Sequence, residues 1–273
     1  NYPDTPLTTI IMTPVSQEQL NREMDGMNIP DITSATIRQI LALANRLENH
    51  LGQPFVHLEM GNPGLPASDI GIEAEREALL RGIANQYPNI AGIKPLKENG
   101  SKFLKAFLDI DIPDRCIVPT VGSMQGTFTL FILLSQRIPG KDTVLFLDPG
   151  FPAQHHQAKL LGLKQESLDV YDCRGEALEA RLEQALSKGN ITAILYSNPN
   201  NPAWFNFTSV EHEIIGRMAD KYDAIVLEDH AYLGMDFRQR YGVPYTAPFV
   251  PTVAKYTKNC ILLVSASKIF SYA

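Results

Sequence analysis

Five short motifs in this chain contain residue types that could take part in catalysis or hold a ligand, and four of them directly follow an apolar run. A polar residue that follows a buried strand is well placed for chemistry, because ligands of parallel sheets bind beyond the carboxyl ends of the strands. In chain order the motifs are residues 122–126 (GSMQG), 148–152 (DPGFP), 197–202 (SNPNNP), 228–232 (EDHAY) and 265–268 (SASK).

The first two motifs could hold an anion and a flat ring. The Gly/Ser turn at 122–126 opens a helical stretch, and the backbone N–H groups of a helix N-terminus favour an anion such as phosphate. In the 148–152 motif two prolines flank Phe151 and fix its ring at the edge of the sheet, where it could stack on a planar cofactor. Each pattern by itself is more typical of an ordinary strand-to-helix turn and of a packed loop aromatic.

The next two motifs combine a rigid turn with a buried acidic pair. Two Asn-Pro pairs within 197–202 stiffen a turn and can host a cis X-Pro bond. Glu228 and Asp229 end an apolar run, and burying them costs free energy unless they have a partner, such as a cationic ring nitrogen, a metal or an arginine. His230 invites a metal interpretation, but no second ligand stands at metal-site spacing, so we predict no metal site.

The last motif places an amine beside hydroxyl groups. Lys268 follows a buried strand, and the neutral amine of a lysine in such a place can attack a carbonyl carbon. Ser265 and Ser267 could bind a phosphate through hydroxyl and backbone donors. In order, the motifs supply a phosphate turn, an aromatic clamp, an Asn-Pro loop, Asp-x-x-Tyr and Ser-x-Ser-Lys. They describe a pocket for a planar aromatic aldehyde with a phosphate and a ring nitrogen, and that description fits pyridoxal 5'-phosphate.

The elements that must position these motifs are strands and helices in alternation. Strands that are apolar on both faces and are separated by helices favour an α/β fold with a mostly parallel sheet covered on both sides. The apolar runs predict strands at 55–60, 143–147, 191–196, 224–227 and 260–264, and amphipathic stretches predict helices near 70–86, 97–108, 123–137, 153–162, 175–188 and 208–221.

The N-terminal region has a different pattern. Prolines at positions 3, 6, 14 and 30 and weak periodicity predict an arm or irregular segment over residues 1–30. Behind it, helix-start residues at 31–34 and apolar residues at one-face spacing predict a helix over 34–51, which Gly52 ends.

Composition and charge exclude several classes of protein. Of 273 residues, 44% are hydrophobic and 20% charged, and a net charge of −6 without a Lys/Arg run argues against nucleic acid as a partner. No apolar stretch is long enough to span a bilayer, so we expect no membrane partner. Without a signal-peptide pattern, and with three widely separated cysteines that fit reduced thiols, the protein is predicted to be cytoplasmic.

The five motifs, in this order, resemble those of the fold-type I pyridoxal-phosphate enzymes, and specifically the class I/II aminotransferases related to aspartate aminotransferase. The resemblance runs from about residue 31 to the last residue. It implies a three-layer α/β sandwich whose central sheet belongs to a cofactor-binding large domain at 55–273, preceded by an arm and helix of a small domain at 1–54. It also implies a homodimer.

The resemblance assigns roles to individual residues. It implies that Lys268 is the Schiff-base lysine and moves a proton, and that Asp229 pairs with the pyridinium nitrogen. Tyr232 and Asn201 then hydrogen-bond the 3-oxygen of the cofactor. The other implied ligands are Phe151 on the ring, Ser123, Met124 and Ser265 at the phosphate, Tyr87 at the phosphate of the neighbouring subunit's cofactor, and Gly61 with Asn201 at the substrate carboxylate.

Two features depart from the family pattern. The usual Asn-Pro-Thr-Gly is Asn-Pro-Ala-Trp at 201–204, so the loop can differ in shape and in substrate contact. The chain also ends at Ala273, shortly after Lys268, where the family continues with a phosphate-binding arginine and a C-terminal small domain that binds the substrate carboxylate. We therefore expect an incomplete chain without the C-terminal small domain, which alone would be a poor enzyme.

The resemblance favours an enzyme that moves an amino group between an amino acid and a 2-oxo acid through a lysine Schiff base. A same-fold β-lyase or decarboxylase, or a cofactor-binding regulator, would share these residues. A serine acyltransferase could use Ser265 and Lys268 as S-x-x-K, but that pattern belongs on a helix start with further motifs downstream. A nicotinamide-dependent dehydrogenase would need G-x-G-x-x-G after the first strand, and the chain lacks it.

Overall fold

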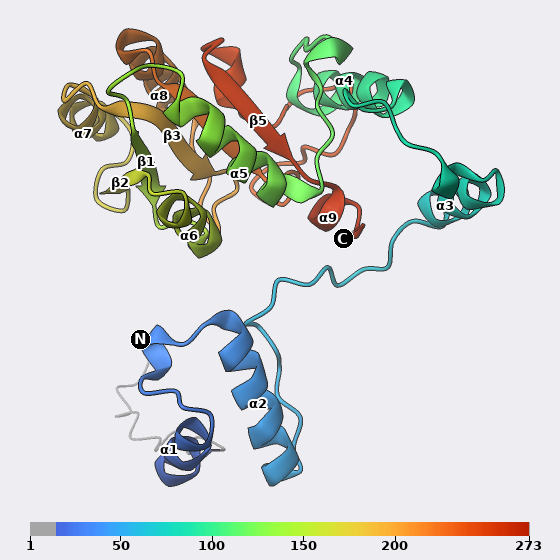
Figure 1. The fold of residues 1–273 in the computed structure, drawn as a ribbon, viewed down its shortest axis with the longest axis vertical. Helices are drawn as coiled ribbons and strands as arrows, with labels where there is room; N and C mark the ends of the chain where they lie inside the picture. Colours follow the sequence, from blue (N-terminus) through green and yellow to red (C-terminus); the bar gives the residue numbers. More distant parts are fainter. Residues whose placement is uncertain (1–14, 273) are drawn as a thin grey trace, which may run out of the picture. The chain divides into compact units, whose positions relative to one another are not determined.

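The computed structural model describes residues 15–272, and the chain divides into two compact units, Asn1–Asn62 and Pro63–Ala273 (Figure 1). The division falls close to the boundary predicted between residues 54 and 55. The assignment of the two parts to a small and a large domain stays a prediction.

The first unit contains two helices with matching start signals. Ser16 begins one helix and Thr36 the other, each in a capping box with the glutamine three residues on, and Gly52 at φ 63° ends the second. The helix predicted over 34–51 is confirmed, whereas the irregular segment predicted over 1–30 is wrong where the first helix lies, because the flanking prolines fall outside it. Residues 1–14 lie outside the described part. The elements are α1 (Gln17–Gly26), η1 (Ile32–Ser34) and α2 (Ile37–Leu51).

The strand predicted at 55–60 is wrong. This segment has no regular structure, and Val56 and Leu58 are more than four-fifths exposed. Its backbone is held by a side chain instead of a neighbouring strand, since the N–H of Phe55 donates to a carboxylate oxygen of Glu48 at 2.5 Å. A short alternating run forms a strand only beside a partner strand.

The second unit is built on a five-stranded, all-parallel sheet in the order β2-β1-β3-β4-β5 (Figure 1). The α/β fold with a mostly parallel sheet is therefore confirmed. The edge strand β2 is absent from the predicted set, because its sequence KQESLD is polar and largely exposed. The strands are β1 (Thr143–Asp148), β2 (Lys164–Asp169), β3 (Ile191–Ser197), β4 (Ile225–His230) and β5 (Cys260–Val264).

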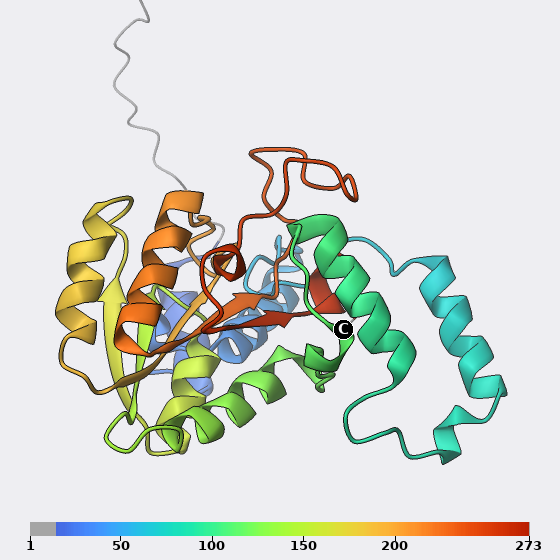
Figure 2. The ribbon, with the colours of Figure 1, turned by 90° about the horizontal axis from the view of Figure 1, so that it is seen from above.

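Helices cover both faces of this sheet and make the three layers (Figures 1 and 2). Helices α5 (Gly122–Ser135) and α6 (Pro152–Leu160) cover one face, and α7 (Ala177–Leu186) and α8 (Ser209–Tyr222) cover the other. The remaining elements of the unit are α3 (Asp69–Leu80), η2 (Ile83–Asn85), α4 (Lys94–Leu108), η3 (Asp114–Cys116), η4 (Val253–Lys255) and α9 (Ala266–Ile269).

Alternation along β4 decides which side chains reach which face. Val226 packs in the core under α7 and α8, and Leu227 packs in the core under α5 and α6. Because successive strand residues point to opposite faces, Glu228 and His230 lie on the α8 side, and Asp229 lies on the α6 side.

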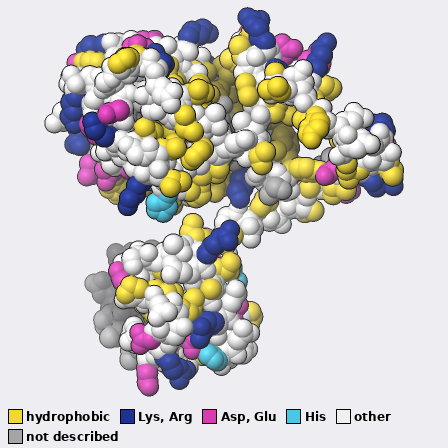
Figure 3. All heavy atoms as spheres, viewed as in Figure 1, with side chains coloured by type: hydrophobic (Ala, Val, Ile, Leu, Met, Phe, Trp, Pro, Cys, Tyr) yellow, Lys and Arg dark blue, Asp and Glu magenta, His cyan; other side chains and the backbone are white. Residues whose placement is uncertain are grey.

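Part of the second unit leaves large apolar side chains exposed. Figure 3 shows hydrophobic side chains at the surface around α3 and α4. The most exposed of these side chains include Leu65, Ile70, Leu80, Tyr87 and Ile90.

No helix within residues 15–272 is long and apolar enough to cross a lipid bilayer.

Candidate active site

Four of the five motifs lie where the parallel strands end. Asp148, Ser197 and His230 are the last residues of β1, β3 and β4, and Ser265 directly follows β5. All strands run the same way, so these ends share one edge of the sheet.

Asp229 is a buried carboxylate with one hydrogen bond to each oxygen. It is 4% exposed; its Oδ1 accepts the N–H of Ala231 at 3.0 Å, and its Oδ2 accepts Nε2 of Gln154 at 2.7 Å. Burial raises the pKa of Asp229 above its ordinary value, although both hydrogen bonds act in the opposite direction. Both donors are neutral, and the carboxylate would gain from a nearby cation such as a protonated ring nitrogen. The site therefore fits the pyridine ring that the motifs predict.

Tyr232 and Asn201, predicted to share one cofactor oxygen, are brought together. Nδ2 of Asn201 lies 3.4 Å from the hydroxyl of Tyr232, and the N–H of Asn201 donates to the hydroxyl of Ser197 at 3.1 Å. Burial, with a smaller effect of the Asp229 charge, raises the pKa of Tyr232, so its phenol is held in the protonated form. Two hydrogen-bonding groups on neighbouring strand ends thus converge, and their contact with a cofactor stays a prediction.

Ser123 and Met124 lie in the first turn of α5, which begins at Gly122 with φ 69°. Backbone N–H groups in a first helical turn lack intrahelical acceptors and can bind an anion. A Cβ on Gly126 would lie only 2.7 Å from Cδ2 of Leu263, so this glycine lets α5 approach β5 closely.

Lys268 and Ser265 closely follow β5, the strand that contains Leu263. Ser265 caps α9, its Oγ accepting the N–H of Ser267 at 3.2 Å, and Lys268 is in the same short helix. In the sheet Leu263 is paired with Asp229, so Ser265, the cap of this helix, stands two residues beyond the pair, at the edge that carries Asp229. The attachment of a cofactor to Lys268 stays a prediction.

Phe151 and the Asn-Pro turns also lie at this edge. Phe151 precedes α6, and its carbonyl oxygen accepts the N–H of Gln154 at 3.1 Å. Three peptide bonds in the 148–152 and 197–202 motifs are cis, those before Pro149, Pro199 and Pro202. Trp204, where the family pattern has glycine, adopts φ 57° and meets the Tyr232 ring edge-on, with centroids 5.5 Å apart.

Two predicted site residues belong to neither the strands nor the helices at this edge. Gly61 belongs to the first unit, and Tyr87 lies beyond η2 with a fully exposed side chain. Their roles at a substrate carboxylate and at a neighbouring subunit's phosphate stay predictions.

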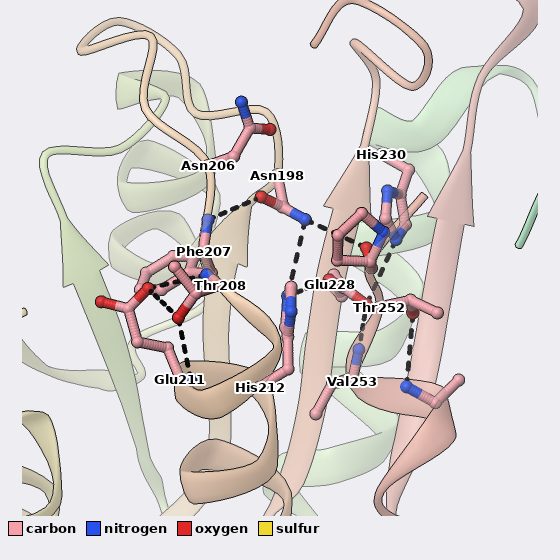
Figure 4. Close-up of polar contacts among 12 residues, drawn as sticks. Asn198, Asn206, Phe207, Thr208, Glu211, His212, Glu228, His230, Thr252 and Val253 are labelled. Carbon is pink, nitrogen blue, oxygen red and sulfur yellow. Dashed lines mark hydrogen bonds and ion pairs between the residues drawn. The ribbon is translucent and has the colours of Figure 1, made fainter. Parts of the chain in front are cut away.

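A buried polar cluster on the opposite face of β4 was not predicted (Figure 4). Glu228 is fully buried and lies between two histidines, with Nε2 of His212 at 2.8 Å and Nε2 of His230 at 3.2 Å. The hydroxyl of Thr252 and the N–H of Val253 also donate to it, at 2.6 and 3.0 Å. His230, considered above as a metal ligand, therefore faces Glu228. Residues 15–272 contain no group of three or more His, Cys, Asp or Glu side chains that could hold a metal ion.

The charges in this cluster stabilise one another. Burial opposes ionisation of Glu228, but the positive potential of His230 and His212 outweighs it and holds the pKa of that carboxyl well below its usual range. Burial also opposes ionisation of His230 and by itself would lower its pKa. The negative charge of Glu228 has the larger effect, so the pKa of His230 is raised.

Comparison with known proteins gives a consistent family. A family model described as aminotransferase class I and II matches residues 54–273. Aspartate aminotransferase of Pyrococcus horikoshii is 27% identical over 241 residues, which are 88% of this chain and 57% of that protein. A transaminase of (5-formylfuran-3-yl)methyl phosphate from Methanocaldococcus jannaschii is 31% identical over 218 residues, 75% of this chain and 53% of that protein.

Solved structures support the same fold. A double mutant of Thermus thermophilus aspartate aminotransferase superposes with a TM-score of 0.71 at 20% identity, covering 90% of this chain and 61% of that one. An aminotransferase from Mycobacterium tuberculosis gives a TM-score of 0.70 at 20% identity, covering 88% of this chain and 59% of that one. The chain thus spans little more than half the length of these relatives.

Proposed function

The chain belongs to the class I and II aminotransferase family, whose members use pyridoxal 5'-phosphate, and on that premise we propose that the whole protein is a pyridoxal-phosphate-dependent aminotransferase. It moves an amino group between an amino acid and a 2-oxo acid, with Lys268 as the Schiff-base lysine. The observation that carries this proposal is the buried Asp229 carboxylate with two neutral donors, on the strand next to the one that leads to Lys268.

Each residue at the sheet edge then has a chemical task. When bound, pyridoxal phosphate supplies an electron sink for the charge that develops at the substrate Cα. Asp229 keeps the ring nitrogen protonated, which makes that sink effective. Lys268 would hold the cofactor covalently through Nζ, and the same amine would serve as the general base and acid that moves the proton at the substrate Cα.

The remaining residues bind and orient the cofactor. Tyr232 and Asn201 hold its 3-oxygen, and Phe151 stacks on its ring. The first turn of α5, with Ser123 and Met124, holds the phosphate together with Ser265. Asn201 also binds the substrate carboxylate.

We further propose that the enzyme works as a homodimer in the cytoplasm. The exposed apolar side chains of the second unit, among them Ile70, Leu80 and Ile90, are of the kind that a protein interface covers. Tyr87, in the same region and fully exposed, then contacts the phosphate of the partner's cofactor. The three cysteines are free thiols, as in proteins of a reducing compartment.

Lys268→Ala in the whole protein tests the covalent assignment. The wild-type protein, incubated with pyridoxal phosphate and reduced with borohydride, should carry a single modified lysine at position 268 by peptide mapping, and the variant should carry none. Lys258→Ala is the matched control, because Lys258 precedes β5 at the opposite end of the same strand, and it should keep the adduct.

The reaction is tested with the same protein. Wild type mixed with an amino acid and a 2-oxo acid should release the corresponding 2-oxo acid and amino acid. An adduct retained in Lys268→Ala, or mapped to another lysine, would contradict the assignment. A β-lactam adduct on Ser265 would instead support a serine acyltransferase.

A further inference from the structure

Helix α6 reaches two parts of the candidate site through glutamine side chains. Gln154, in its first turn, is 1% exposed and donates from Nε2 to Oδ2 of Asp229 at 2.7 Å. Gln157, one turn later, donates from Nε2 to the carbonyl oxygen of Met124 at 2.8 Å and accepts from the hydroxyl of Thr127 at 2.7 Å. Gln154 thus contacts Asp229, the predicted partner of the ring nitrogen, and Gln157 contacts the turn that is predicted to bind the phosphate.

The two glutamines are placed by the same short helix. Residues three apart lie on one helix face, so both side chains point toward the sheet and α5. The helix starts directly after Phe151, whose carbonyl oxygen accepts the N–H of Gln154. Phe151, Asp229 and the start of α5 are therefore linked through a helix of nine residues.

We propose that Gln154 and Gln157 are positioning residues, Gln154 holding the Asp229 carboxylate toward the cofactor ring nitrogen and Gln157 holding the first turn of α5 at the cofactor phosphate. Helix α6 thereby sets the separation between the ring end and the phosphate end of the site. The inference rests on the proposed function, since both targets belong to the proposed cofactor site.

An amide is chemically suited to the task of Gln154. Its N–H groups donate, and it takes up no proton and carries no charge near neutral pH. With Ala231 on Oδ1 and Gln154 on Oδ2, the carboxylate cannot rotate freely, yet its negative charge is not neutralised. The charge stays available to the ring nitrogen, whereas a lysine or arginine at position 154 would compete for it.

Gln157 acts at the other end of the site. Its hydrogen bonds hold a carbonyl and a buried hydroxyl of the first two turns of α5. Because one of these contacts is on Met124 itself, next to Ser123, Gln157 fixes where the N–H groups of this turn point. Its loss should therefore act on phosphate binding and leave the ring end unchanged.

Methionine substitutions separate the two tasks, because Met has a similar size and lacks the amide. We would titrate the whole protein with pyridoxal phosphate and with pyridoxal, which lacks the phosphate, and obtain a dissociation constant for each. Gln154→Met should weaken both ligands by the same factor, about 10- to 100-fold, as expected for losing a hydrogen bond to a charged group. Gln157→Met should weaken pyridoxal phosphate and change pyridoxal by less than about twofold. Each variant is the matched control of the other.

A second variant gives a signature that loss of packing does not produce. Gln154→Glu keeps the shape of the side chain, and its carboxyl can donate to Asp229 only while protonated. Cofactor retention in this variant should fall as pH rises through the pKa of the introduced carboxyl. Over the same pH range Gln154→Met should stay uniformly weak, and circular dichroism should show that each variant is folded.

The possible outcomes distinguish a failure of this inference from a failure of the proposed function. Gln154→Met without an effect, or with an effect on pyridoxal phosphate alone, would overturn the inference, as would equal weakening of both ligands by Gln157→Met. If wild type binds no pyridoxal phosphate, the proposed function fails and this inference falls with it. If wild type binds and Gln154→Met is unchanged, the inference alone fails.

Discussion

Glu228 and Asp229 are adjacent acidic residues of β4, yet their surroundings shift their pKa values in opposite directions. Asp229 faces α6 and two neutral donors, so burial dominates and raises its pKa. Glu228 faces α8 and two histidines, whose effect exceeds that of burial and lowers its pKa. The alternation of a strand thus separates a carboxylate paired within the protein from one that would gain from a bound cation.

Asp229→Asn should weaken cofactor binding, because a buried cationic ring nitrogen would then lie beside a neutral amide. Removing one partner of a buried ion pair costs about 3–5 kcal/mol, so the dissociation constant of pyridoxal phosphate should rise by about 100-fold or more. Absorbance titrations of the cofactor against pH should also show the ring nitrogen losing its proton at lower pH than in wild type.

Asp148→Asn is the control for that measurement. Asp148 ends β1 at the same sheet edge, but its Oδ1 is paired with Nε2 of His155 at 3.0 Å. The control should bind the cofactor as wild type does. An unchanged spectrum and affinity in Asp229→Asn would rule out the pairing with the pyridinium nitrogen.

At the scale of elements, the sequence predicted most of what has a strong local pattern. Strands β1, β3, β4 and β5 are mainly apolar, helix α6 starts at a proline and helix α8 at a capping box, so their positions could be predicted. The edge strand β2 is polar, and the run at 55–60 alternates like a strand but has no partner strand, so the pattern misleads in both cases. Strand identity at an edge depends on the neighbour and not on the segment itself.

Some residues of the site could be predicted from the sequence and others could not. Asp229, Tyr232 and Asn201 stand in motifs at strand ends, and the structure places the last two side by side. Gln154 and His212 were missed, because a glutamine or histidine within a helix gives no sign of the carboxylate it meets across the fold. The only hint is that two glutamines three residues apart follow the 148–152 motif directly.

The start of α8 is tied to the segment after β2 by one ion pair, which makes this junction sensitive to acid. Glu211, 1% exposed, accepts from Nε of Arg174 at 2.6 Å and from the N–H groups of Gly175 and Thr208 at 2.8 and 2.7 Å (Figure 4 shows Glu211 with Thr208). Burial opposes ionisation, but these hydrogen bonds outweigh it and lower the pKa of Glu211 to about 2 from an ordinary 4.5.

Glu211→Gln should therefore lower the free energy of unfolding in a pH-dependent way. A depressed carboxyl pKa stabilises the fold above pH 4.5, and this contribution is lost as pH falls toward 2. The variant should be less stable by on the order of 3 kcal/mol at pH 7. The difference in the free energy of unfolding between the two proteins should become smaller as the pH falls from 4.5 toward 2. Urea unfolding of both proteins at several pH values between about 2.5 and 7 measures this difference in the free energy of unfolding. The series runs from neutral pH down toward the lowered pKa of Glu211, about 2.

The control for this prediction is an exposed ion pair on the same layer. Glu179 pairs with Arg217 at 2.8 Å between α7 and α8, and about half of each side chain is exposed. Glu179→Gln should change stability by less than about 1 kcal/mol, because solvent screens such pairs. Equal losses in the two variants would contradict a special role for Glu211.

At the scale of the whole molecule, the proposed homodimer makes each active site a product of two subunits, with Lys268 from one and Tyr87 from the other. Tyr87→Ala and Lys268→Ala would each impair every site of their own dimers. In a mixed dimer one site receives both intact residues, and the other receives neither. When the two variant proteins exchange subunits at random, activity should therefore return to about a quarter of wild type.

This complementation is measured by mixing the variants of the whole protein after mild dissociation and assaying transamination at a limiting concentration of pyridoxal phosphate, at which Tyr87→Ala alone stays largely unloaded. Lys268→Ala mixed with Asp229→Asn is the matched control, because both residues belong to the same subunit's site, and no mixed dimer then contains an intact one. Mixtures of Tyr87→Ala and Lys268→Ala that stay inactive, although differently tagged subunits are shown to exchange, would refute a role for Tyr87 across the interface. Activity gained in both mixtures would show instead that the sites are assembled in some other way, because subunit exchange can restore a site only when the two changed residues come from different chains.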